Sequence, residues 1–134
     1  MKNKIMLITY ADSFGKNLKE LSGVLDRHFS GAVGSIHILP FFPSSGDRGF
    51  SPMTYEEVDP AFGDWNDIRA LSEKYELMYD FMVNHLSRRS PQFLDFIRRH
   101  DASPYKDMFI RFKEFWPGGA PTQADIDRHN KGKD

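Results

Sequence analysis

The sequence predicts an α/β fold in which three parallel strands alternate with two helices. Three short apolar runs, at residues 5–10, 35–39 and 77–83, have the length and composition of buried strands. A helical pattern separates each run from the next, and strands joined in this way lie parallel, with right-handed crossovers. A chain of 134 residues is one domain or a piece of one, and its 40% hydrophobic content suffices for a core.

The first strand and the first helix follow from the pattern near the amino terminus. Residues 5–10 form the strand, and the polar residues Asp12 and Ser13 follow its end. Asn17 can cap the helix, with Glu20 placed to reach back toward the cap. The apolar stripe of this helix recurs at helical spacing: Leu18, Leu21, Leu25 and Phe29.

The second strand leads into the loop that we expect to carry the functional site. Pro40 and Pro43 cannot extend a sheet ladder, so the strand ends near Leu39. Beyond it come Asp47 and Phe50, a carboxylate and an aromatic ring flanked by glycines. Folds of this class place binding groups at such strand ends. An ordinary loop with a helix-capping Asp and an exposed Phe has the same pattern, so this alternative stays open.

The second helix and the third strand follow without a long break. Asp64 caps the helix, and its apolar face is predicted to hold Trp65, Ile68, Leu71 and Tyr75. The third strand spans residues 77–83, with Asp80 in its middle, and the pair Asn84-His85 follows it. Because parallel strands end at one edge of the sheet, we expect Asp12, Asp47 and this pair to converge there.

The regular alternation ends after the third strand. A further helix begins at Pro91, and its apolar residues are Phe93, Leu94, Phe96 and Ile97. Residues 105–110 are interpreted as a short strand or a turn, and residues 122–134 as a polar tail. We therefore divide the chain into residues 1–85 and an incomplete second lobe, residues 86–134.

Composition narrows the possible partners. The net charge is −1, with 18 basic and 19 acidic residues, so no strong field is available to attract nucleic acid or an anionic membrane. Aromatic residues without a basic surplus favour small molecules or neutral polymers. The absence of cysteine fits a reducing cytoplasm, and no segment approaches the roughly 20 apolar residues of a membrane span. We expect a soluble cytoplasmic protein.

The five histidines show no metal-ligand spacing. His37 lies within a buried strand and is expected to be a core histidine whose hydrogen bonds are satisfied. His85 differs, because it stands just beyond a strand end beside Asn84. It is the histidine that we select as a site residue.

Residues 80–85, with the sequence DFMVNH, resemble the first conserved region of the α-amylase superfamily, glycoside hydrolase family 13. Longer stretches resemble the sucrose phosphorylases, and most closely the sucrose 6-phosphate phosphorylase branch: residues 1–15, 37–65 and 82–93. The similarity extends over residues 1–117. It implies a (β/α)8 TIM barrel with a small domain B after the third strand. Residues 1–85 would then be the first three β/α units of this barrel, and residues 86–134 the start of domain B.

The resemblance also implies a sugar site. The position of Asp47 contacts glucosyl hydroxyls in that family, that of Phe50 lies against a sugar face, and that of His85 touches the same glucose. Asp80 matches a position that supports the third strand. Asn84 matches a calcium ligand of many amylases, but phosphorylases of this type lack the ion, so we expect no metal and no other cofactor. The catalytic Asp and Glu of the family follow strands four and five, beyond this chain, and three carboxylates here are not expected to replace them: Asp59, Asp64 and Glu73.

The implied activity is retaining glucosyl transfer from sucrose or sucrose 6-phosphate to phosphate, which gives glucose 1-phosphate and fructose or fructose 6-phosphate. The alternatives are a glucosylglycerate phosphorylase, an α-glucoside hydrolase, or a non-catalytic sugar-binding remnant. The partners would be the sugar and inorganic phosphate, and the full-length protein a monomer or homodimer. Arg88 and Arg89 are candidates for a substrate phosphate, although basic pairs are more often solvated. As an amino-terminal fragment, the chain alone should be inactive and poorly stable, with Ile36 and Ile38 among the apolar side chains left exposed.

Overall fold

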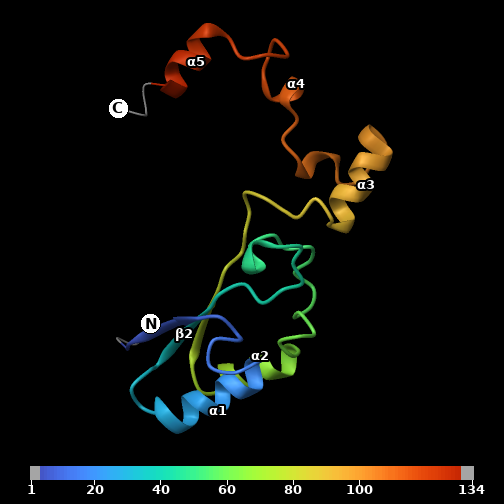
Figure 1. Cartoon of the computed structure of the whole chain (residues 1–134). Helices are drawn as coiled ribbons and strands as arrows, with labels where there is room; N and C mark the ends of the chain where they lie inside the picture. Colours follow the sequence, from blue (N-terminus) through green and yellow to red (C-terminus); the bar gives the residue numbers. More distant parts are fainter. Residues whose placement is uncertain (1–3, 131–134) are drawn as a thin grey trace. The chain divides into compact units, whose positions relative to one another are not determined.

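Three parallel strands form the sheet within residues 4–130, the part of the chain that the computed structural model describes (Figure 1). The strands lie in chain order with β2 in the centre, and their bounds are β1 (Met6–Thr9), β2 (Ser35–Ile38) and β3 (Glu76–Tyr79). Leu7 is aligned with Ile36, and Ile36 with Leu77. The predicted parallel α/β arrangement is confirmed for these residues.

Two helices provide the connections between the strands. α1 (Leu18–His28) joins β1 to β2, and α2 (Trp65–Ser72) joins β2 to β3. The two helices contact each other and lie side by side (Figure 1). Each of the leucines and isoleucines that they bury with the central strand stabilises the fold by about 1.5–3 kcal/mol. The fully buried leucines and isoleucines of this core are Leu18, Leu21, Leu25, Ile36, Ile38 and Leu71.

The two faces of β2 have different surroundings. Ile36 and Ile38 belong to the helix-covered core and are fully buried, so the expectation that they would be left exposed is wrong. The opposite face carries His37, in register with Ile8 of β1 and Met78 of β3. Ile8 is 61% exposed. The His37 face therefore carries uncovered apolar side chains, because side chains alternate along a strand and Met78 on this face is also 37% exposed.

Helix caps confirm two sequence predictions. The Asn17 side chain accepts a hydrogen bond from the Glu20 N–H (2.9 Å), while the Glu20 carboxylate accepts one from the Lys16 N–H (2.9 Å). Asp64 caps α2 by accepting from two backbone N–H groups, and its own N–H donates to Asp67 (3.0 Å). The backbone hydrogen bonds to its carboxylate hold the pKa of Asp64 below its usual range.

β3 is shorter than predicted. It ends at Tyr79, whereas the apolar run suggested a strand through Val83. Residues 80–83 have no paired strand within the described part of the chain, and their side chains are largely exposed, as at Phe81 (68%) and Val83 (77%). An apolar run shows that a segment can be buried in a sheet, but a ladder also needs a neighbour with free backbone groups.

The chain divides into two compact units, Met1–Leu94 and Asp95–Asp134, while the sequence suggested a boundary after His85. α3 (Pro91–Arg99) begins at the predicted proline. Beyond it, residues 105–110 contain a 3₁₀ turn and no strand. The remaining short elements are η1 (Asp47–Gly49) in the loop after β2, and η2 (His100–Ala102), η3 (Lys106–Met108), α4 (Phe112–Phe115) and α5 (Gln123–Asn130) after α3. No helix among the described residues is long and apolar enough to cross a membrane.

α5 lies in the segment that was interpreted as a polar tail. Thr122 and Asp125 form its cap: the Thr122 N–H donates to the Asp125 carboxylate (2.9 Å), and the Asp125 N–H donates to the Thr122 hydroxyl (3.3 Å). The Thr122 hydroxyl (2.6 Å) and the Thr122 N–H both donate to the Asp125 carboxylate and lower its pKa. The spacing of a Thr and an acid three residues apart was a visible helix signal. Residues 131–134 of the tail lie outside the described part.

Candidate functional site

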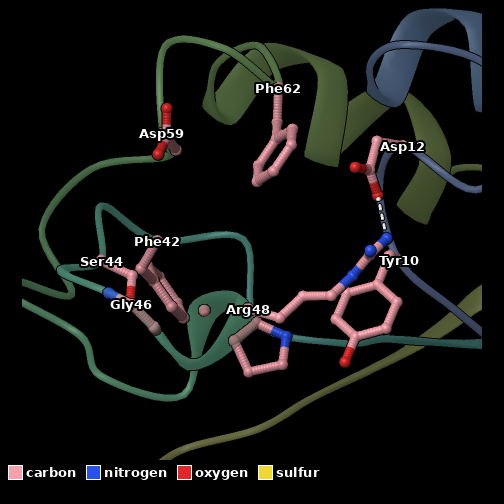
Figure 2. Close-up of a pocket in the computed structure, with 10 residues that line it drawn as sticks. Tyr10, Asp12, Phe42, Ser44, Gly46, Arg48, Asp59 and Phe62 are labelled. Carbon is pink, nitrogen blue, oxygen red and sulfur yellow. Dashed lines mark hydrogen bonds and ion pairs between the residues drawn. The ribbon is translucent and has the colours of Figure 1, made fainter.

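A pocket of about 240 Å³ lies at the carboxyl ends of β1 and β2. Tyr10 and Asp12 line it from the end of β1, and the loop after β2 contributes Phe42 and Arg48. Figure 2 shows the Arg48 side chain running past the Tyr10 ring toward Asp12, with Phe62 across the pocket. This is the edge of the sheet at which the sequence predicted a site.

Arg48 ties the loop after β2 to the end of β1. Its guanidinium is 3.1 Å from an Asp12 carboxylate oxygen and 4.3 Å from the centre of the Tyr10 ring. The Arg48 and Asp12 side chains are 62% and 37% exposed, so the ion pair contributes at most about 1 kcal/mol. The contact matters more for geometry than for stability, because the Asp12 charge and the Tyr10 ring together orient the guanidinium in one direction.

The turn that carries Asp47 has an uncommon backbone. Asp47 (φ 54°) and Arg48 (φ 46°) are both left-handed, and Gly49 follows with φ 98°. A Cβ atom on Gly49 would lie 2.5 Å from the Pro40 carbonyl oxygen, so the turn can approach the end of the strand only with glycine at this position. Left-handed non-glycine residues cost about 1 kcal/mol or more each, and such strain gathers at functional sites.

Hydrogen bonds within the same loop hold this turn. The Ser44 hydroxyl lies 2.7 Å from the Gly46 carbonyl oxygen and 2.8 Å from that of Ser51, and the Ser45 N–H donates to the latter (3.0 Å). The Met53 N–H donates to the Pro43 carbonyl (2.8 Å), which closes the loop at its base. The turn that carries Asp47 is therefore part of a loop whose two ends are held together by hydrogen bonds.

Backbone and side-chain hydrogen bonds connect the three predicted site residues in space. Asp47 is exposed at the turn, and the Phe50 N–H donates to its carbonyl oxygen (3.0 Å). His85 reaches the same loop, with Nε2 2.7 Å from the Phe50 carbonyl oxygen. A carbonyl oxygen can only accept, so Nε2 carries a proton and the neutral imidazole keeps Nδ1 as an acceptor. Asp47, Phe50 and His85 do not line the pocket itself.

The other predicted positions have simple surroundings. His37 Nε2 lies 3.0 Å from an Asp80 carboxylate oxygen, which confirms that its side chain is hydrogen-bonded. The expectation of a core position is wrong, because the side chain is 18% exposed on the uncovered face of the sheet. Arg88 and Arg89 are exposed. Within residues 4–130, no three His, Asp or Glu side chains are grouped as metal ligands would be.

Sequence reasoning missed the contacts that connect this site. Arg48 looked like any loop arginine, and no local pattern pairs it with Asp12, which is 36 residues away along the chain. Tyr55 also carried no signal. Its hydroxyl accepts from the Met82 N–H (3.0 Å) and donates to the Met82 carbonyl (3.1 Å). Burial raises the pKa of the Tyr55 phenol, which keeps it protonated and able to donate.

Comparison with known proteins gives a consistent set of relatives. A family model described as alpha amylase, catalytic domain, matches residues 8–130. Sucrose phosphorylase from Streptococcus mutans is 58% identical over 132 residues, which is 98% of this chain and 27% of the relative. Glucosylglycerol phosphorylase from Marinobacter adhaerens is 51% identical over 115 residues, 86% of this chain and 24% of the relative.

A solved structure is also similar. The crystal structure of sucrose 6F-phosphate phosphorylase from Thermoanaerobacter thermosaccharolyticum has a TM-score of 0.86 and 52% identity, and covers 95% of this chain and 26% of that chain. This chain thus spans about a quarter of the length of these relatives.

Proposed function

We propose, because the chain belongs to the alpha-amylase family, that residues 1–85 form the first three β/α units of a (β/α)8 catalytic barrel. Residues 86–134 then begin the inserted domain B. The parallel order β1-β2-β3, with α1 and α2 as crossovers, supports this assignment. So does the position of the pocket, since barrels of this kind carry their active sites at the carboxyl ends of the strands.

The activity that we assign to the whole protein is phosphorolysis of an α-glucoside, either sucrose or sucrose 6-phosphate. The observation that carries this proposal is the 58% identity to a sucrose phosphorylase, which extends over 98% of the chain. The products are glucose 1-phosphate and fructose or fructose 6-phosphate. A similar identity, 52%, to a sucrose 6F-phosphate phosphorylase leaves the acceptor sugar to experiment.

The reaction is a retaining double displacement. A carboxylate attacks the anomeric carbon and the bond to the fructosyl oxygen breaks, while a carboxylic acid gives its proton to that oxygen. A phosphate oxygen then attacks the anomeric carbon and releases the nucleophilic carboxylate. The carboxyl group that gave its proton to the fructosyl oxygen takes up a proton from phosphate in this second step. Neither catalytic carboxylate is assigned to this chain.

This chain's part in the reaction is to bind the glucosyl unit. The Asp47 carboxylate accepts hydrogen bonds from sugar hydroxyls, and the Phe50 ring covers an apolar sugar face. His85 donates from Nε2 to the Phe50 carbonyl and offers Nδ1 to a hydroxyl. The short link between His85 and Phe50 supports a common site, because it joins the segment after β3 to the loop after β2.

Phosphorolysis of another glucoside is the second candidate. The 51% identity to a glucosylglycerol phosphorylase favours it, and the 43% identity to a glucosylglycerate phosphorylase makes glucosylglycerate a further candidate substrate.

Arg88 and Arg89 concern the choice between sucrose and sucrose 6-phosphate. Both side chains are exposed and available to pair with the phosphate of sucrose 6-phosphate. A non-catalytic sugar-binding protein remains a separate class of function, which an activity measurement distinguishes.

A hybrid enzyme tests the proposal. This chain replaces the matching segment of the Streptococcus mutans sucrose phosphorylase, and the hybrid is supplied with phosphate and, in turn, sucrose, sucrose 6-phosphate, glucosylglycerol and glucosylglycerate. We expect glucose 1-phosphate to form, and its formation to stop when Asp47→Ala is introduced. The Streptococcus remainder without this chain is the blank. A folded hybrid that gives no more glucose 1-phosphate than this blank contradicts the proposal.

A further inference from the structure

The segment between β3 and His85 is held by a side chain where a strand would normally hold it. Tyr55 uses one hydroxyl for both backbone groups of Met82: it accepts from the N–H (3.0 Å) and donates to the carbonyl oxygen (3.1 Å). A neighbouring strand would satisfy these same two groups through its own N–H and carbonyl. Tyr55 therefore replaces a sheet partner at the point where β3 has already ended.

Ring contacts that do not involve the hydroxyl hold the aromatic ring of Tyr55 in place. It packs edge-on against Phe42, with ring centres 4.9 Å apart, and at a tilt against Phe81, with ring centres 4.6 Å apart. Phe42 is buried and stacks on Phe41, which is part of the core. The Tyr55 ring thus packs against the core through Phe42, and this packing holds the phenol oxygen in one position. Since burial raises its pKa, the hydroxyl keeps the proton that it donates.

Contacts on both sides of Met82 leave His85 with little freedom. Before it, Asp80 is bound to His37 of β2 (3.0 Å). After it, the Ser87 N–H donates to the Pro52 carbonyl (2.9 Å), and the Ser87 hydroxyl is 2.6 Å from that of Ser45. His85 stands between the anchors at Met82 and Ser87.

We propose that Tyr55 is a positioning residue, which fixes the backbone at Met82 and thereby sets the His85 imidazole against the Phe50 carbonyl in the sugar site. This inference rests on the proposed function, and it names a residue that acts on the glucosyl unit only through His85. The hydroxyl can be tested by itself, because removing that oxygen leaves the ring contacts with Phe42 and Phe81 in place.

The variant Tyr55→Phe tests the inference in the hybrid enzyme. Two neutral hydrogen bonds are lost, and the resulting displacement of His85 is expected to lower kcat/KM about tenfold at a temperature where the variant is folded. Tyr75→Phe is the matched control, since it also removes the hydroxyl of a tyrosine that packs in the core cluster. Tyr75 lies before β3, at the amino-terminal edge of the sheet. We expect it to leave kcat/KM unchanged.

A double-variant cycle separates positioning from a general loss of structure. In the His85→Ala background there is no imidazole to place, so adding Tyr55→Phe is expected to change kcat/KM less than twofold. The same tenfold loss in both backgrounds would show that Tyr55 acts independently of His85 and would overturn the inference. Unchanged kcat/KM in Tyr55→Phe itself would overturn it as well.

Amide hydrogen exchange keeps this test distinct from that of the proposed function. Tyr55→Phe should speed exchange in peptides that cover residues 80–86, whereas Tyr75→Phe should not. An inactive parent hybrid counts against the proposed function, but the exchange of this segment is still measured. If Tyr55→Phe leaves that exchange unchanged, the phenol does not position the segment, whatever the activity.

Discussion

Replacing Gly49 by alanine should displace the turn that presents Asp47. The substitution Gly49→Ala adds a methyl group 2.5 Å from the Pro40 carbonyl oxygen, at a residue whose φ is 98°. The backbone conformation costs an L-residue about 1–2 kcal/mol, and forcing an extra carbon into a packed position about 1–3 kcal/mol more. We therefore expect a loss of about 2–5 kcal/mol in the free energy of unfolding, or a relaxed turn in which Asp47 has moved.

Two other glycines separate these two costs. Gly31 has φ 79° but no atom within 4 Å of an added Cβ, so Gly31→Ala carries only the backbone cost of about 1–2 kcal/mol. Gly23 lies inside α1 with no such neighbour and no positive φ, so Gly23→Ala should stabilise by about 0.5–1 kcal/mol.

Urea unfolding and kcat/KM of the three hybrid variants measure both consequences. Gly49→Ala should unfold at the lowest urea concentration and lose at least about tenfold in kcat/KM, because only this change reaches the Asp47 turn. Gly31→Ala should keep its activity. The reasoning is refuted if Gly49→Ala is as stable and as active as Gly31→Ala, since the close approach to Pro40 would then have no consequence.

Three further predictions concern the site, a helix cap and the open sheet face. In the hybrid, Asp47→Ala should lower kcat/KM by about a hundredfold or more, and His85→Ala by less, because a carboxylate accepts several hydrogen bonds where imidazole makes one; a loss below tenfold for a folded Asp47→Ala rejects the assignment. The lowered pKa of Asp64 contributes stability above its unfolded value near 3.8 that disappears as the pH falls below it. Asp64→Asn, which still caps, should flatten this acid dependence in pH-dependent urea unfolding. The purified chain alone should associate, since Ile8 and Met78 on the His37 face are 61% and 37% exposed, and a monodisperse monomer in sedimentation contradicts this. It should also show no phosphorylase activity, because neither catalytic carboxylate is assigned to it.

The parts of the fold that depend on local pattern could be predicted from the sequence. Asn17 and Asp64 cap helices because their side chains reach backbone groups two or three residues away. The leucines of α1 are buried as their spacing indicated. Such features need no knowledge of distant residues, and a short window therefore contains the information.

Features that depend on a neighbour could not be predicted in this way. The apolar run after Tyr79 reads as strand, but residues 80–83 have no strand beside them in the described part of the chain. The direction of Ile36 and Ile38 was also missed. Alternation fixes that they share a face, yet which face α1 and α2 cover is set by the crossovers and not by β2 itself.

The candidate site shows the same division more sharply. The pattern of a carboxylate, glycines and an aromatic ring after a strand points to Asp47 and Phe50, and the position just beyond the third predicted strand points to His85. What orients these side chains comes from residues that pattern does not connect: Asp12 with Arg48, and Tyr55 with Met82. Both pairs join a strand end to the loop after β2. That loop is therefore fixed from two sides, by an exposed ion pair near β1 and by a partly buried phenol near β3. Because the phenol has packed neighbours and the ion pair is open to water, we expect the β3 side to determine how rigidly the sugar site is held.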